Sequence, residues 1–98
     1  MIHSFAGAGT EDLFNGKDSK AARRTCPTQL QSAAVAKLDV LNAVTTLEEL
    51  KDPPGNRLEA LKGDRAGQHS IRINRQYRIC FRWENDGVAD VEVSKHYE

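Results

Sequence analysis

The sequence predicts an α/β (α+β) fold, in which a helical N-terminal half packs on a C-terminal antiparallel β-sheet. Apolar residues recur with a helical period over 28–44, whereas from residue 70 onward they alternate with polar ones, as in strands with one buried face. Residues 51–55, Lys-Asp-Pro-Pro-Gly, separate the two patterns because they interrupt regular structure. A length of 98 residues predicts a single domain over 1–98, built on one hydrophobic core.

The composition excludes several classes of protein. Fourteen basic and fourteen acidic side chains give no net charge, and 39% of residues are hydrophobic, which argues against disorder. Cys26 and Cys80 are too few for a disulfide framework, and the three histidines lie far apart, so we expect no metal site and no cofactor. We see no signal peptide and no apolar stretch of about 20 residues, so we expect a cytoplasmic protein without a membrane partner.

The N-terminal segment predicts short elements. Residues 2–5 are apolar and compatible with a first strand. Thr10 precedes two acidic residues, which predicts a short helix over 10–14 with Thr10 as its N-cap. Residues 17–25 are polar and basic, which predicts a loop or an irregular second turn.

The main helix is predicted over 28–44. Pro27 suits a helix start, and Thr28 with Gln31 has the spacing of a capping box. An apolar stripe recurs at helical spacing, at Leu30, Ala34, Leu38 and Leu41. This stripe predicts a buried helix face, and 46–50 predicts one further turn.

The C-terminal half predicts an antiparallel meander. Strands are expected over 70–73, 77–83 and 90–94, because apolar and polar residues alternate there. Residues 74–76 predict a tight connection, and the Asp-Gly pair within 84–87 predicts a hairpin turn, because it tolerates positive φ.

Strand alternation assigns the side chains of this sheet to two faces. The inner face, under the helices, receives Ile71, Ile73, Tyr77, Ile79, Phe81, Trp83, Val91 and Val93. The outer face receives Arg72, Arg78, Cys80, Arg82, Glu92, Ser94 and, if the last strand continues, His96. We expect Glu92 to form a structural salt bridge with Arg78, and Cys80 to be a small half-buried residue rather than a nucleophile.

Positive charge is concentrated between residues 57 and 82, where seven basic and two acidic side chains give a net charge of +5. A solvated strand face would also carry such charges. However, six of the seven are Arg, whose planar guanidinium suits phosphate oxygens. Arg72 and Arg78 lie on consecutive strands and can converge on one phosphate, which favours a nucleic-acid partner. The further candidate RNA contacts are Arg57, Lys62, Arg65, His69, Arg75 and Arg82.

The remaining chemistry is that of a metal-free set of Arg, Lys, His and Tyr. The motifs of serine hydrolases, dinucleotide-binding proteins and P-loop proteins are missing from the sequence. Such a set can cleave RNA, because the RNA's own 2′-hydroxyl is the nucleophile. Arg72 and Arg78 would stabilise the pentavalent phosphorane. The candidates for general acid or base are His96, with Lys95 or Tyr97 as substitutes, and His69.

Much of the C-terminal half resembles one family. The residues that carry the likeness are Pro53 to Arg65, Gly67-Gln68, 70–74 and 77–83, and together they resemble the HigB-type (host inhibition of growth, plasmid killer) toxins of the RelE superfamily. The resemblance implies a RelE-like domain with two N-terminal helices on a twisted antiparallel sheet. It also implies metal-independent endonucleolytic cleavage of mRNA in the ribosomal A site, which inhibits translation. The implied partner is a HigA-like helix-turn-helix antitoxin, through which alone operator DNA would be bound.

The resemblance places the catalytic residues at Arg72, Arg78 and the 95–97 end. Family members often end the last strand Asp-Tyr-His, whereas this chain reads Lys95-His96-Tyr97. Either the strand ends before Lys95, or the role of the histidine has moved to Tyr97 or Lys95.

Two other functions remain open at this point. The outer face could hold RNA or an acidic antitoxin segment without cleaving anything. Alternatively, the protein could be a ribonuclease that acts without ribosomes.

Overall fold

The computed structural model describes residues 1–95, which form three α-helices, three 3₁₀ turns and a four-stranded antiparallel sheet. The helices are α1 (Ala8–Phe14), α2 (Lys20–Thr25) and α3 (Thr28–Ala43), and the 3₁₀ turns are η1 (Leu47–Lys51), η2 (Pro54–Asn56) and η3 (Gly63–Arg65). The strands are β1 (Glu59–Ala60), β2 (His69–Arg72), β3 (Tyr77–Glu84) and β4 (Gly87–Lys95), in the spatial order β1-β2-β3-β4. The expected fold class is confirmed.

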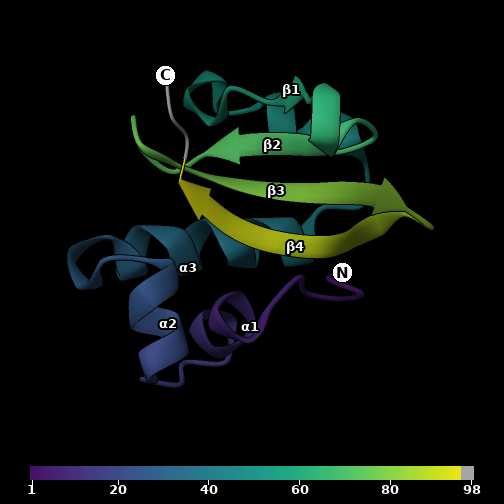
Figure 1. Cartoon of the computed structure of the whole chain (residues 1–98). Coiled ribbons are helices and arrows are strands. Elements are labelled where there is room, and N and C mark those ends of the chain that lie inside the picture. Colours follow the sequence, from purple (N-terminus) through teal and green to yellow (C-terminus); the bar gives the residue numbers. More distant parts are fainter. Residues whose placement is uncertain (96–98) are drawn as a thin grey trace.

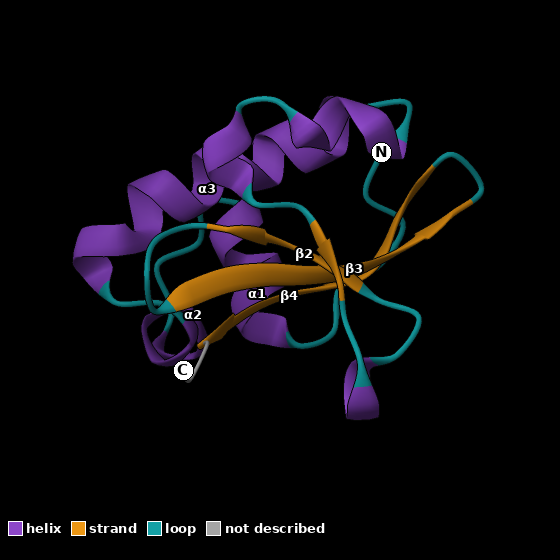
Figure 2. Cartoon of the chain, turned by 90° about the horizontal axis from the view of Figure 1, so that it is seen from above, coloured by secondary structure: helices purple, strands orange, loops and turns teal. Residues whose placement is uncertain are grey.

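The helices lie on one side of the sheet and beyond one of its edges. Figures 1 and 2 show α3 along one face and α1 and α2 beyond β4. The opposite, outer face is not covered by α1, α2 or α3, and η3 projects on that side (Figure 2).

The first helix differs in its start from the prediction. Gly7 occupies the N-cap position of α1, so Thr10 lies within the helix and the prediction that it caps the helix is wrong. The Thr10 side chain is only 2% exposed, and its Oγ1 accepts a hydrogen bond of 3.0 Å from the backbone N of Val93. The Thr10 hydroxyl therefore joins α1 to the last strand.

An additional helix, α2, forms where the sequence predicts a loop or an irregular turn. Ser19 is its N-cap, and its Oγ accepts from the backbone N of Ala22 at 3.0 Å and donates to Asp12 Oδ2 at 2.7 Å. The resemblance to the toxins implies two N-terminal helices, whereas residues 1–95 contain three α-helices before the sheet.

The main helix is confirmed, with α3 ending one residue before the predicted end. Its buried residues are Ala34, Leu38 and Leu41, which belong to the predicted stripe. The predicted capping box is not formed: Pro27 is the N-cap, and Gln31 Nε2 donates instead to the Cys26 carbonyl at 3.2 Å. The further turn expected at 46–50 is η1.

The sheet confirms the predicted meander and adds one strand. The hairpin between β3 and β4 turns at Asn85 and Asp86, whose φ angles of 51° and 61° are those of a type I′ turn. Strand β1 is not predicted from the sequence, because two residues are too short to show alternation. Residues 2–5 do not form a named strand; isolated parallel bridges join Ile2 and Phe5 to β4.

The inner face of the sheet is confirmed as part of the core. Ile71, Ile79, Phe81, Val91 and Val93 are buried. The other predicted members pack against this cluster while partly exposed, and they are Ile73, Tyr77 and Trp83. Burial of a Phe side chain contributes several kcal/mol relative to Ala. This packing fixes the side to which the alternate, outer residues point. Within residues 1–95, every helix is too short or too polar to cross a membrane.

Candidate functional site

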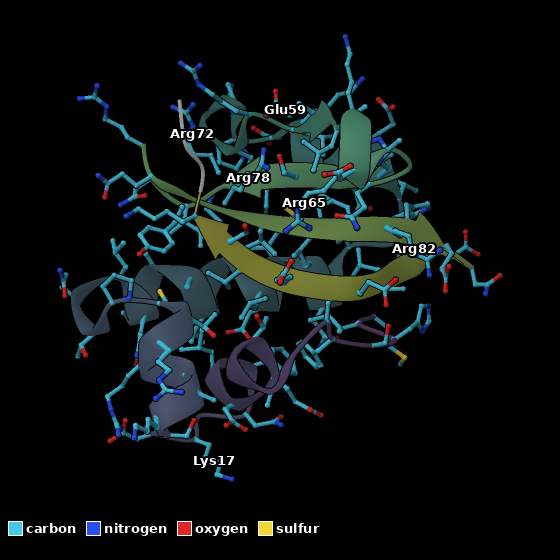
Figure 3. All side chains as sticks on the ribbon, viewed as in Figure 1. Lys17, Glu59, Arg65, Arg72, Arg78 and Arg82 are labelled. Carbon is cyan, nitrogen blue, oxygen red and sulfur yellow. The ribbon has the colours of Figure 1, made fainter. Side chains whose placement is uncertain are left out.

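Arg72 and Arg78 lie directly opposite each other on β2 and β3. Directly opposed residues of an antiparallel pair point to the same side, with Cβ atoms about 4.5–5.5 Å apart. Figure 3 shows both residues towards the same end of the sheet, on the face turned away from α3. The sequence prediction that the two guanidinium groups share the outer face is confirmed.

A small pocket lies beside this pair. Its volume is about 70 Å³, and its lining residues are Arg57, Glu59, Ser70, Arg72, Asn74, Tyr77 and Arg78. Pockets that enclose a whole drug-sized ligand have volumes of roughly 300–1,000 Å³. The pocket therefore suits one ionic group, such as a phosphate, and three arginines stand around it.

The third of these arginines is held by its neighbour in the chain. Asn56 is 1% exposed, donates from Nδ2 to the Leu50 carbonyl at 3.2 Å, and accepts a hydrogen bond from Lys37 Nζ. Arg57 follows in a left-handed conformation, with φ of 46°, at the end of η2. Asn56 thus anchors the turn that carries Arg57 to α3 and η1, and from this turn Arg57 reaches the pocket.

Sequence reasoning missed Glu59. It lies on β1 opposite Ser70, so its side chain shares the outer face with Arg72. Among the described residues that line the pocket, Glu59 is the one carboxylate. Because β1 has only two residues and Arg57 before it is left-handed, no alternation in the sequence places Glu59 on this face.

Glu92 does not pair with Arg78, so that prediction is wrong. Arg65, which ends η3, donates from Nη2 to Glu92 Oε1 at 2.7 Å and from Nη1 to Gln68 Oε1 at 3.0 Å. The hydrogen bond to Glu92 raises the pKa of Arg65. Arg65 therefore reaches across β3 from the loop before β2 to the last strand (Figure 3).

Cys80 is fully buried rather than half-buried. Burial raises the pKa of its thiol, and the nearby charges of Arg65 and Arg78 only partly oppose this effect. Cys80 is therefore protonated at neutral pH. This agrees with its interpretation as a packing residue, because the thiolate is the nucleophilic form.

Arg78 carries a buried donor that is not satisfied. Within residues 1–95, its Nε has no hydrogen-bond partner although the atom is buried. A buried unpaired donor costs about 1–3 kcal/mol. Such an unsatisfied group marks Arg78 as a candidate functional residue.

The predicted acid–base residues are not all brought to this pocket. His69 lies on the inner face, where its ring stacks on Phe81 with centroids 6.2 Å apart. Lys95 lies opposite Tyr77, which places it on the same side as Val93 and not on that of Arg78. His96 and Tyr97 lie outside the described residues.

The remaining predicted RNA contacts differ in position. Arg75 is exposed in the β2–β3 connection, next to a pocket residue, and Lys62 is exposed just before η3. Arg82 lies towards the other end of β3 (Figure 3), where it forms ion pairs with Asp90 at 2.7 Å and Glu84 at 3.3 Å. The structure brings Arg57 together with the Arg72–Arg78 pair and keeps Arg82 apart from it.

Solved toxin structures share this fold. The YoeB–YefM complex from Staphylococcus aureus contains a chain with a TM-score of 0.60 and 12% identity, with 99% of both chains covered. A heterotetrameric YoeB–YefM toxin–antitoxin complex from the same organism gives a TM-score of 0.54 and 14% identity, covering 100% of this chain and 99% of that chain. The protein therefore shares its fold with a chain of these toxin–antitoxin complexes.

Sequence comparison defines the family. Residues 3–96 match the RelE-like toxin of the type II toxin–antitoxin system HigB. Toxin HigB-1 of Vibrio cholerae serotype O1 is 46% identical over 66 residues, which are 67% of this chain and 68% of that protein. An uncharacterized protein of Haemophilus influenzae is 34% identical over 70 residues, 71% of this chain and 69% of that one. The chain belongs to the HigB-like toxins of type II toxin–antitoxin systems, within the RelE superfamily.

Proposed function

We propose that this toxin is a ribosome-dependent mRNA endonuclease that inhibits translation by metal-independent cleavage. The observation that carries the proposal is the direct opposition of Arg72 and Arg78 beside a pocket sized for one phosphate. Two cations fixed at one point are suited to the charge that develops on a phosphate during transfer.

In the proposed reaction, the 2′-oxygen of the RNA attacks the adjacent phosphorus as the bond to the 5′-oxygen breaks. A base takes the proton of the 2′-hydroxyl, an acid protonates the leaving 5′-oxygen, and the products are a 2′,3′-cyclic phosphate and a 5′-hydroxyl. Arg72 and Arg78 stabilise the phosphorane. Glu59 is the carboxylate at the pocket, so we assign it as a candidate base.

The candidates for the proton donor remain His96 and Tyr97. His69 and Lys95 leave this set, because both lie on the inner side of the sheet, away from Arg72 and Arg78. Arg57, Lys62 and Arg75 remain the proposed RNA contacts. Arg65 and Arg82 leave this set, because carboxylates engage both guanidinium groups.

The proposed partners are the ribosome with its mRNA in the cytoplasm and a HigA-like helix-turn-helix antitoxin. Family membership and the assembly of the structural neighbours with antitoxins support the antitoxin partner. Operator DNA would be contacted only through that antitoxin.

The test is synthesis of the full chain in a reconstituted translation system, with reporter mRNA mapped by primer extension. The wild type is expected to cut the reporter, and the Arg72→Ala/Arg78→Ala variant is expected not to. Arg24→Ala removes an exposed arginine of α2 and serves as the matched control. Equal cleavage by the wild type and the double variant would contradict the proposal.

A second candidate is a non-catalytic module that binds RNA or antitoxin through the same face. The observation that favours it is the position of His69 and Lys95 on the inner side, away from the arginine pair. Tight antitoxin binding without reporter cleavage by the wild-type chain would support this second function.

A further inference from the structure

Three charged side chains surround Cys80 on the outer face. Glu92 lies directly opposite Cys80, and Arg78 lies two residues away on the same strand, opposite Ser94. Arg78 and Glu92 are thus diagonal neighbours, a separation of about 7–8 Å that long side chains can span. Arg65 is the third charge, and it acts on the Cys80 thiol together with Arg78 and Glu92.

The carboxylate of Glu92 is held by Arg65 instead of Arg78. Their contact measures 2.7 Å, and the two side chains are 30% and 36% exposed. The second guanidinium nitrogen of Arg65 is bound to Gln68 at 3.0 Å, and the backbone N of Gln68 donates to the Arg65 carbonyl at 3.0 Å. Arg65 is therefore fixed over the sheet by its own loop, at the position where it takes up Glu92.

We propose that Arg65 is a positioning residue, which holds Glu92 so that Arg78 stays available to a substrate phosphate. The proposal rests on the function proposed above for the same pocket. Without Arg65, Arg78 would be the cation diagonal to Glu92 on the outer face, because Arg82 is engaged by Asp90 and Glu84. An Arg78–Glu92 pair would neutralise the charge that the phosphate needs and would draw the guanidinium away from the pocket.

Removal of Arg65 should therefore weaken phosphate binding at the pocket, although Arg65 does not line the pocket. A half-exposed ion pair of about 1 kcal/mol gives about five molecules with Arg78 paired for each one with Arg78 free, so roughly one molecule in six keeps Arg78 free. Arg65→Gln is expected to lower cleavage and RNA binding about sixfold. Arg65→Lys keeps a cation for Glu92 and should recover most of the loss.

The deciding variant is Arg65→Gln/Glu92→Gln. It lacks both partners, so no carboxylate competes for Arg78, and it is expected to recover nearly wild-type behaviour although it carries one more substitution. Two other roles of Arg65 predict a different result. If Arg65 only stabilised its loop, or contacted the RNA directly, the double variant would cleave and bind no better than Arg65→Gln. Arg24→Gln is the matched control, and urea unfolding of each variant establishes that it is folded.

Two readouts separate this inference from the function on which it rests. Reporter cleavage depends on the nuclease activity and on the role of Arg65, whereas fluorescence anisotropy with a 2′-O-methyl RNA oligomer measures phosphate binding alone. Recovery of binding in the double variant supports the role of Arg65 even if neither the wild type nor any variant cuts the reporter. Absence of cleavage by the wild type would contradict only the proposed nuclease function. A double variant that binds as weakly as Arg65→Gln, or an Arg65→Gln variant that binds like the wild type, overturns the inference.

Discussion

Replacement of Arg78 by Gln should change activity and stability in opposite directions. Arg78 lies directly opposite Arg72, and like charges in opposed positions destabilise a sheet by about 0.2–1 kcal/mol. Its Nε is a buried donor without a partner in residues 1–95, which adds to the cost. The Arg78→Gln substitution removes the charge, so the free energy of unfolding is expected to rise by up to about 1 kcal/mol. Loss of one donor to a developing oxyanion lowers the rate about 10²–10³-fold, so cleavage should fall by that factor.

Both quantities can be measured on the same protein. Urea unfolding is followed by the fluorescence of Trp83, which is the single tryptophan and lies on β3. Cleavage is followed by primer extension on a reporter mRNA. Arg82→Gln, on the same strand, is the control: it breaks contacts with Asp90 and Glu84, so it should lower stability and leave cleavage unchanged. An Arg78→Gln chain that loses stability together with activity would mean that Arg78 supports the fold, and the reasoning about a poised guanidinium would be refuted.

Three further predictions concern the scaffold. Thr10→Val should lower the free energy of unfolding by about 1–3 kcal/mol, because the buried backbone N of Val93 loses its hydrogen-bond acceptor. Thr46→Val, at an exposed position, is the control and should leave the free energy of unfolding unchanged. Equal urea midpoints for the two variants would refute the prediction. Gly9→Ala should lower the free energy of unfolding, measured with urea, by about 1–3 kcal/mol, because the new Cβ would lie 2.6 Å from the Ala21 carbonyl oxygen. Gly55→Ala is the control, because a Cβ at that position meets no atom within 4 Å. Burial raises the folded-state pKa of the Cys26 and Cys80 thiols above the ordinary 9.0, so their stabilising contribution is complete below pH 9 and is lost as the pH rises beyond it. Urea unfolding between about pH 8 and 10 should show this decline, and Cys26→Ala/Cys80→Ala should flatten it; an unchanged slope would contradict it.

Local signals in the sequence were sufficient where an element is long or its turn is specific. The α3 stripe repeats along the whole helix, and the Asn85-Asp86-Gly87 turn has residues that accept positive φ, so both were predictable. Helix α2 was missed because its short, mostly polar sequence shows no apolar period, and only Ser19 as an N-cap marks it. Strand β1 has two residues, and its existence depends on pairing with β2 rather than on its own sequence.

The residues of the candidate site also divide into those that local sequence patterns predict and those that they do not. Arg72 and Arg78 could be paired from the sequence, because a tight connection and strict alternation fix their register. Glu59 could not be placed without β1. The contact of Arg65 with Glu92 joins residues 27 positions apart, and it depends on the path of the loop through η3, where Gly63 has a φ of 63°. Such long-range contacts between loop and strand have no local sequence signal, which is why Glu92 was assigned to the wrong arginine.

The arrangement of the pocket also predicts that cleavage depends on the ribosome. The pocket of about 70 Å³ has room for one phosphate-sized group, so it cannot by itself align the 2′-oxygen, the phosphorus and the leaving 5′-oxygen of a flexible RNA. Alignment of reacting groups contributes about 7–11 kcal/mol in well-oriented systems, and loss of only about 4 kcal/mol corresponds to a thousandfold lower rate. We therefore expect cleavage of the same mRNA to be at least about a thousandfold slower when it is free than when it is translated. Comparison of the two by primer extension, with Arg72→Ala/Arg78→Ala as the background, measures this ratio. A ratio near one would show that the protein is a free-standing ribonuclease, and that residues outside this pocket align the RNA.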